Sequence, residues 1–298
     1  MRTLRLVVAL AVLGLLSGRA VAGTPAVKSG GNFEVKAVRD IDYHGGKDAD
    51  PVRHRLDLFL PAEQKDYPVL VFVHGGAWTK GSRGGFEKLA RLLARNGVGT
   101  AITNYRLSPQ VQHPAHTQDV AKAVAWVHGN IARYGGRPDQ LFLSGHSAGG
   151  HLVALLGTDP TYLEAAGVPL KDIKGVIPIS GVYTFRPGSM PKVFGDDKEA
   201  YRKAAPLTHV KGQHPPFLIL VADSDLKGFD KMAEQFCDAL GKSGCTAKVI
   251  NVKDRNHGTI VGQMTNLGDP GTQAVLAFIA RHSSLKLHES EAAKGGKS

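Results

Sequence analysis

Short apolar stretches alternate with segments of helical periodicity along most of this chain, and this alternation constrains the fold more than any other feature. Residues 69–73 (VLVFV) are continuously apolar, as expected of a strand buried on both faces of a sheet. Residues 54–60 alternate polar and apolar side chains until their end, which suits a partly exposed antiparallel strand. Further strands are predicted at 33–43, 97–102, 141–143, 173–179, 217–221 and 246–252, and helices at 85–95, 117–134, 148–157, 228–241 and 269–282. The pattern predicts an α/β fold, with a mostly parallel central sheet, antiparallel N-terminal strands and helices on both faces.

The N-terminal 22 residues have the pattern of a secretory signal peptide. Arg2 and Arg5 precede an apolar run at residues 6–16, and the small residues Ala20-Val21-Ala22 follow. A membrane anchor is the weaker interpretation, because a run of 11 residues is short for a membrane-spanning helix. No later stretch is long enough to span a membrane. We therefore expect an exported protein, either periplasmic or extracellular.

Residues 23–282 are predicted to form a single domain, followed by a polar, disordered tail at 283–298. The connection at 181–214 is long and rich in Gly, Pro and Lys, so it is either a small lid or pocket wall or an ordinary surface excursion. The two cysteines, Cys237 and Cys245, flank a predicted helix end and strand start. Export favours a disulfide between them, and two free structural thiols are the alternative.

Composition and motifs exclude several classes of function. The formal net charge is +11, but Lys and Arg are scattered without a basic run, and no nucleic-acid-binding motif is present, so we expect a solvated basic surface. The chain contains no H-E-x-x-H, no cysteine pairs at zinc spacing and no carboxylate cluster, so no metal is indicated. No G-x-G-x-x-G follows the first strand, so no dinucleotide is expected. The oligomeric state stays open.

The segment Gly145-His146-Ser147-Ala148-Gly149 matches G-x-S-x-G and lies between a predicted strand and a predicted helix. A serine hydroxyl is a weak nucleophile that must be exposed to both a base and a substrate, and a sharp strand-to-helix turn exposes it. The Ala148 N–H at the helix N-terminus is placed to stabilise an oxyanion. The pentapeptide alone is a weak signal, and its context makes Ser147 the candidate nucleophile.

A second signal is His74-Gly75-Gly76-Ala77-Trp78, directly after the buried strand at 69–73. Glycines at this place let the main chain approach a substrate without a side-chain clash. Gly75, Gly76 and Ala77 are the candidates for a second oxyanion donor, with Gly76 or Ala77 preferred.

An acid and a base are expected after the serine, in that order. Asp223 and Asp225 follow the strand at 217–221, at the carboxyl edge of the predicted sheet. We predict that Asp225 is the acid, with Asp223 as a structural turn residue. His257 follows the last strand and a polar turn, and is the predicted base.

Taken together, these motifs resemble those of the α/β-hydrolase superfamily over residues 33–282, in particular bacterial esterases with an HGG-type oxyanion loop, either feruloyl-esterase-like or arylformamidase-like. Shorter similarities are Asn104-Tyr105-Arg106-Leu107-Ser108-Pro109, Pro114-Ala115 with Asp119, and Asp254-Arg255-Asn256-His257. The chain departs from some relatives in having HGGAW in place of HGGG and Ala222 at the start of the acid turn. The resemblance implies an α/β-hydrolase fold and hydrolysis of carboxylic esters or amides without a cofactor, and we expect a small-molecule ester as the substrate.

Two other functions stay open at this point. One is an amidase, formamidase or small peptidase that uses the same three residues. The other is a hydrolase fold that serves as a non-catalytic binding protein.

Overall fold

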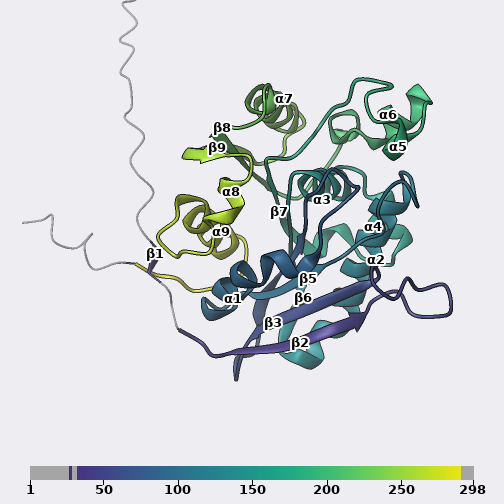
Figure 1. Cartoon of the computed structure of the whole chain (residues 1–298). Helices are drawn as coiled ribbons and strands as arrows, with labels where there is room; N and C mark the ends of the chain where they lie inside the picture. The colour runs from purple at the N-terminus through teal and green to yellow at the C-terminus, as the bar shows by residue number, and fades with distance from the viewer. Residues whose placement is uncertain (1–26, 29–31, 290–298) are drawn as a thin grey trace, which may run out of the picture.

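The computed structural model describes residues 27–28 and 32–289, and the predicted signal peptide lies outside them. Within these residues the main sheet has eight strands in the order β2-β3-β5-β4-β6-β7-β8-β9 (Figure 1). They are β2 (Val35–Asp42), β3 (Arg55–Pro61), β4 (Tyr67–Val73), β5 (Gly99–Thr103), β6 (Gly136–His146), β7 (Ile173–Ile179), β8 (Phe217–Ser224) and β9 (Ala247–Asn256). The β2–β3 and β3–β5 pairs are antiparallel and the remaining pairs are parallel, which confirms the predicted fold class.

Helices cover both faces of this sheet. One face packs against α1 (Glu87–Arg95) and α9 (Pro270–Arg281), and the other packs against α2 (Ala115–Asn130), α3 (Ala148–Thr158) and α7 (Phe229–Lys242) (Figure 1). In α1 the buried residues Leu89, Ala90, Leu93 and Ala94 recur on one face, so the helix is amphipathic. Every residue of α3 is buried, because this helix lies between the sheet and its neighbours. Each fully buried leucine contributes about 1.5–3 kcal/mol to folding.

The parallel strands place several turns at one edge of the sheet. The carboxyl ends of β4 and β6 are in register, and Val73 pairs with Gly145 there. The carboxyl ends of β6 and β7 are also in register, and His146 pairs with Ile179. Since parallel strands all end at the same edge, the turns after β4, β6, β7 and β8 lie side by side. This edge is where an α/β fold places a ligand site.

The described elements differ from the predicted ones at a few places. Strand β6 begins at Gly136 instead of 141, since the polar residues before the apolar triplet are also extended. The long connection at 181–214 contains two short helices, α5 (Pro191–Phe194) and α6 (Lys198–Ala204). A further short helix, α8 (Thr259–Gly262), follows β9, and α4 (Thr161–Ala165) follows α3.

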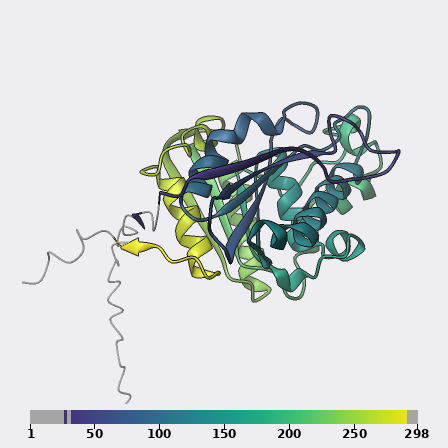
Figure 2. The ribbon, with the colours of Figure 1, turned by 90° about the horizontal axis from the view of Figure 1, so that it is seen from below.

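The first residues of the predicted disordered tail contact the body of the domain. The Ser284 N–H donates to Gln140 Oε1 at 3.0 Å, and Leu285 packs against the core on the α1–α9 face. Strands β1 (Val27–Lys28) and β10 (His288–Glu289) then pair in an antiparallel ribbon at the side of the molecule, as Figure 2 shows. Residues 290–298 lie outside the described part of the chain.

The expected disulfide is not formed, because Cys237 and Cys245 are both free thiols. The Cys245 Sγ instead contacts the backbone oxygen of Pro215 at 3.2 Å, so its thiol is directed at a carbonyl. Burial raises the pKa of the Cys245 thiol to about 11, which disfavours the thiolate.

Candidate active site

Ser147 occupies the sharp turn between β6 and α3. Its backbone has φ 54° and ψ −116°, a conformation that costs energy in a residue with a side chain. Gly145 and Gly149 are required on either side by close packing. A Cβ on Gly145 would lie 2.6 Å from the backbone of Gly149, and one on Gly149 would lie 2.1 Å from the Val73 oxygen. The turn therefore presses against the end of β4 and holds the serine hydroxyl outward.

His257 and Asp225 complete a line of hydrogen bonds with Ser147. The Ser147 hydroxyl lies 3.0 Å from Nε2 of His257, and Nδ1 of His257 lies 2.7 Å from Oδ1 of Asp225. With Nδ1–H donating to the carboxylate, Nε2 is free to accept the serine proton. The three residues predicted from the sequence are thus brought together from turns 32 and 110 positions apart.

Asp225 rather than Asp223 contacts the imidazole. The Asp225 side chain is only 3% exposed. Burial by itself would raise the pKa of this carboxyl, but hydrogen bonds from His257, Ser180, Leu226 and Ala222 outweigh it, so the pKa is lowered overall. Asp223 is instead exposed, and its carboxylate accepts the backbone N–H groups of Asp254 and Arg255, each at 3.0 Å. It therefore ties the end of β8 to β9.

The His74–Trp78 loop passes beside the serine. A Cβ on Gly75 would lie 2.8 Å from the His146 backbone oxygen and 3.1 Å from Cβ of Ser147, so glycine is required for this approach. Gly76 and Ala77 follow with φ 120° and 51°, which turn the chain sharply. Ala148 is the first residue of α3, so its N–H has no acceptor within the helix. The predicted donors Gly75, Gly76, Ala77 and Ala148 therefore belong to the two backbone segments next to Ser147.

Trp78 anchors the loop to the body of the protein. Its indole N–H donates to Nδ1 of His151 at 3.2 Å, and Nε2–H of His151 donates to the Ala204 oxygen at 2.7 Å. Burial lowers the pKa of His151 to about 3, so the ring stays neutral and can serve both bonds. Phe185 and Phe194 pack edge-on against the indole. The 181–214 connection thus reaches the glycine loop through Trp78.

Sequence reasoning missed two further contacts. The ring of His146 donates from Nε2 to the backbone oxygen of His257 at 2.7 Å, and the hydroxyl of Ser180 donates to Oδ2 of Asp225. Burial lowers the pKa of His146 to about 4, which keeps this ring neutral. His146 is adjacent to Ser147 in the sequence, which is a signal, but its partner lies 111 positions away and nothing local identifies that partner.

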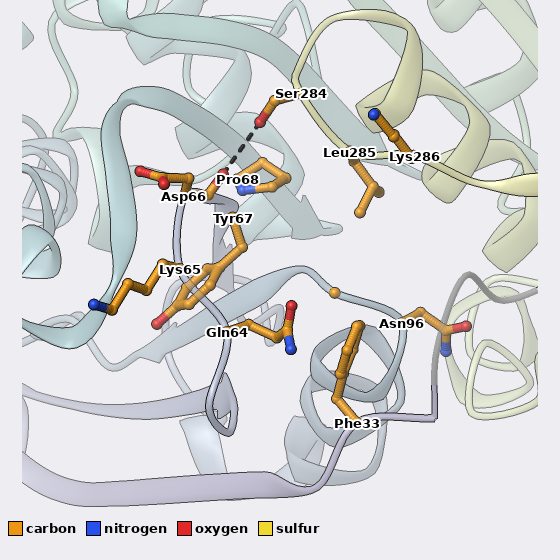
Figure 3. Close-up of a pocket in the computed structure, with 11 residues that line it drawn as sticks. Phe33, Gln64, Lys65, Asp66, Tyr67, Pro68, Asn96, Ser284, Leu285 and Lys286 are labelled. Carbon is orange, nitrogen blue, oxygen red and sulfur yellow. Dashed lines mark hydrogen bonds between the residues drawn. The ribbon is translucent and has the colours of Figure 1, made fainter.

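Three further observations concern a cavity, metal-binding groups and membrane-spanning helices among the described residues. A cavity of about 260 Å³ between Phe33, Tyr67, Asn96 and Leu285 lies at the amino end of β4 (Figure 3). The serine turn contacts the carboxyl end of the same strand. Within the described ranges no group of three or more His, Cys, Asp or Glu is arranged to hold a metal ion. None of the helices described is both long and apolar enough to cross a membrane.

Comparison with known proteins gives consistent matches. Residues 56–183 match the family model BD-FAE, a span that contains the glycine loop and the serine turn but neither Asp225 nor His257. The probable carboxylic ester hydrolase LipM of Mycobacterium tuberculosis is 34% identical over 67% of this chain and 51% of its own length. The probable isoprenylcysteine alpha-carbonyl methylesterase ICMEL1 of Oryza sativa is 30% identical over 76% of this chain and 58% of its own length.

The chain therefore spans about half the length of the curated relatives that it matches. Among solved structures, esterase B from Lactobacillus rhamnosis is similar with a TM-score of 0.72 at 21% identity over 91% of both chains. A putative thioesterase from Silicibacter is similar with a TM-score of 0.66 at 28% identity, over 82% of this chain and 85% of that one. The fold, the serine turn with its glycine loop, and these matches agree, and the chain belongs to the α/β-hydrolase esterase family, with BD-FAE as the matching family model.

Proposed function

We propose that this protein hydrolyses carboxylic esters with Ser147 as nucleophile, His257 as general base and Asp225 as the acid that orients the base. The observation that carries the proposal is the continuous line of hydrogen bonds, 3.0 Å from Ser147 to His257 and 2.7 Å from His257 to Asp225, beside a glycine loop. The names of the similar proteins, which include carboxylic ester hydrolases, add support.

The geometry gives each group one step. The Ser147 oxygen bonds to the carbonyl carbon of the ester as its proton passes to Nε2 of His257. The carbonyl oxygen becomes an oxyanion, which accepts N–H groups of the Gly75–Ala77 loop and of Ala148. The alcohol leaves with the proton from Nε2, and an acyl group stays on Ser147. Water then loses a proton to Nε2 and attacks the acyl carbon, and the carboxylic acid leaves as the serine recovers its proton.

Asp225 stays ionised throughout this sequence. Its lowered pKa keeps a negative charge against Nδ1, where the carboxylate holds the tautomer and stabilises the imidazolium, and its 3% exposure limits the screening of that charge by water. No metal or cofactor is needed by any step, since proton transfer and the oxyanion are both served by groups of the chain.

The decisive experiment compares S147A with the unchanged protein on a short-chain aryl ester. Activity should fall by about 10⁴-fold or more, because the bond-forming oxygen is lost. Ser243, at the end of α7, donates its hydroxyl to the Leu240 oxygen, and S243A is the matched control that should keep full activity. An S147A variant with most of its activity would refute the proposal.

Substrate class and pH dependence are tested on the same protein. Matched oxygen-ester, thioester and amide substrates distinguish an esterase from an amidase, and a thioester is included because a similar structure is described as a putative thioesterase. Activity should fall on acidification, because a protonated imidazole cannot accept the serine proton. A flat profile between about pH 5 and about pH 9 would contradict a histidine base.

We also propose that the protein is exported, that its domain starts after residue 22, and that the 181–214 connection forms one wall of the substrate site. The first two proposals rest on the N-terminal sequence pattern, and the third on the packing of Phe185 and Phe194 against Trp78 of the glycine loop. Cell fractionation, with N-terminal sequencing of the recovered protein, tests export. A cytoplasmic protein with residues 1–22 retained would overturn it.

A further inference from the structure

The end of β7 contacts both the serine turn and the acid turn. Strand β7 lies between β6, which leads to Ser147, and β8, which leads to Asp225 (Figure 1). The Ile179 oxygen accepts the Ser147 N–H at 2.9 Å. The next residue, Ser180, donates its N–H to the Leu220 oxygen at 2.8 Å and its hydroxyl to Oδ2 of Asp225 at 2.5 Å. Two consecutive residues thus connect the nucleophile to the acid independently of His257.

The hydroxyl of Ser180 donates a hydrogen bond to one of the two oxygens of the Asp225 carboxylate. Oδ1 accepts from Nδ1 of His257 and from the Leu226 N–H, both at 2.7 Å. Oδ2 accepts from the Ser180 hydroxyl and from the more distant Ala222 N–H at 3.2 Å. Ser180 is only 1% exposed, so bulk water has little access to replace its hydroxyl. Removing the hydroxyl leaves one carboxylate oxygen with a single, long hydrogen bond.

The backbone of Ser180 argues for a role of its side chain. Its φ is 47°, in the left-handed region that glycine adopts freely and that other residues adopt at an energetic cost. The surroundings are also tight, because a Cβ on Gly150 of α3 would lie 3.1 Å from the Ile179 oxygen and 3.0 Å from Cα of Gly181. The hydrogen bond from its hydroxyl to Asp225 explains why serine, and not glycine, occupies this strained and closely packed position.

We propose that Ser180 is a positioning residue, which holds the Asp225 carboxylate in the orientation that accepts Nδ1–H of His257. The inference rests on the proposed catalytic roles of Ser147, His257 and Asp225. Ser180 contacts no reacting atom in this scheme, and it acts through the carboxylate alone. Its loss should therefore lower the rate of the chemical steps and leave substrate binding nearly unchanged.

The test uses the two variants S180A and S180G, with kcat and KM measured on the same aryl ester. We expect kcat to fall about tenfold in both variants and KM to stay within about twofold of the native value. The reason is that the Asp225 carboxylate, which stabilises the imidazolium in the transition state, loses a hydrogen bond. The glycine variant removes the hydroxyl and also relieves the positive φ, so it should fold at least as well as the native protein. A kcat near the native value in both variants would overturn the proposal.

A double-mutant comparison separates positioning from a structural role. If Ser180 acts through Asp225, adding S180A to a D225A variant should cause no further loss of kcat, since the carboxylate is already absent. A further tenfold loss in the D225A background would show that Ser180 has a role in the turn alone. The Nδ1 proton resonance of His257, observed by ¹H NMR, should move in S180A, and an unmoved resonance would also count against positioning.

The two proposals fail in different ways. If D225A and S147A both kept most of their activity, the proposed function would be wrong. If those variants lost activity while S180A and S180G kept the native kcat, the catalytic roles would stand and the role of Ser180 would be wrong.

Discussion

Replacing Gly149 with alanine should strongly destabilise this protein, although alanine is the better helix former. A Cβ at Gly149 would lie 2.1 Å from the Val73 oxygen and 2.7 Å from both the Val73 carbonyl carbon and the His74 oxygen. Carbon and oxygen atoms that are not bonded approach to about 3.3 Å at the closest. The start of α3 and the end of β4 must therefore separate by about 1 Å, and both are backbone segments held by their own hydrogen bonds.

The cost follows from this displacement. Overpacking of a filled interior costs about 1–3 kcal/mol when side chains yield, and we expect about 3 kcal/mol or more here because backbone has to move. For a domain of this size the melting temperature should fall by about 6–12 °C. Activity should fall as well, because the displaced segment begins at Ala148, whose N–H is a proposed oxyanion donor.

Urea denaturation followed by circular dichroism measures the effect, with the midpoint and the slope fitted separately. Gly241 supplies the control, since it lies in α7 and a Cβ there would meet no heavy atom within 4 Å. G241A should be stabilised by about 0.5–1 kcal/mol through helix propensity alone. Replacing glycine with alanine should therefore lower the free energy of unfolding at position 149 and raise it at position 241. A G149A variant within about 0.5 kcal/mol of the native protein would refute the packing argument.

Three further predictions concern the acid, the buried histidines and the loop anchor. D225N should lower kcat by about 10³–10⁴-fold and D223N by less than about tenfold, and steady-state kinetics showing comparable losses would contradict the assignment of Asp225. Burial lowers the pKa of His151 to about 3 and of His146 to about 4, below the unfolded value of about 6.5. As the pH falls from about 6.5 toward about 4, the unfolded chain binds protons that the folded protein excludes, so the free energy of unfolding should decrease. Equal urea midpoints at about pH 7 and about pH 5 would contradict this pH dependence. W78F should cost about 1–3 kcal/mol, because Nδ1 of buried His151 loses its donor, and a native denaturation midpoint would show that this hydrogen bond is dispensable.

Much of the fold follows from local pattern in the sequence. The apolar run at 69–73 becomes the carboxyl-terminal part of β4, every residue of which is buried, since such a run is stable only between two covering layers. The predicted strand at 173–179 matches β7 to the residue. The polar start of β6 and the contacts of Ser284 were missed, because these residues are ordered by partners that the local pattern does not contain.

The residues of the candidate site divide in the same way. Ser147 and the glycine loop are recognisable in the sequence, since a sharp turn and a close backbone approach each require particular residue types at fixed spacing. The choice between Asp223 and Asp225 had a weaker basis in sequence. Both residues follow the predicted strand at 217–221, where no periodic pattern distinguishes one aspartate from the other, and in the structure β8 ends between them at Ser224.

By itself, then, the sequence determines which segments become strands and helices, and that a serine lies on a turn with a glycine loop nearby, because periodicity and glycine act over a few neighbouring residues. Only the tertiary structure decides that Asp225 accepts from His257 while Asp223 accepts from the backbone of β9, and that His146 contacts His257 and Ser180 contacts Asp225. These contacts join residues between 31 and 111 positions apart, and they depend on how the turns after neighbouring strands meet at one edge of the sheet, where the direction of each side chain is set by packing.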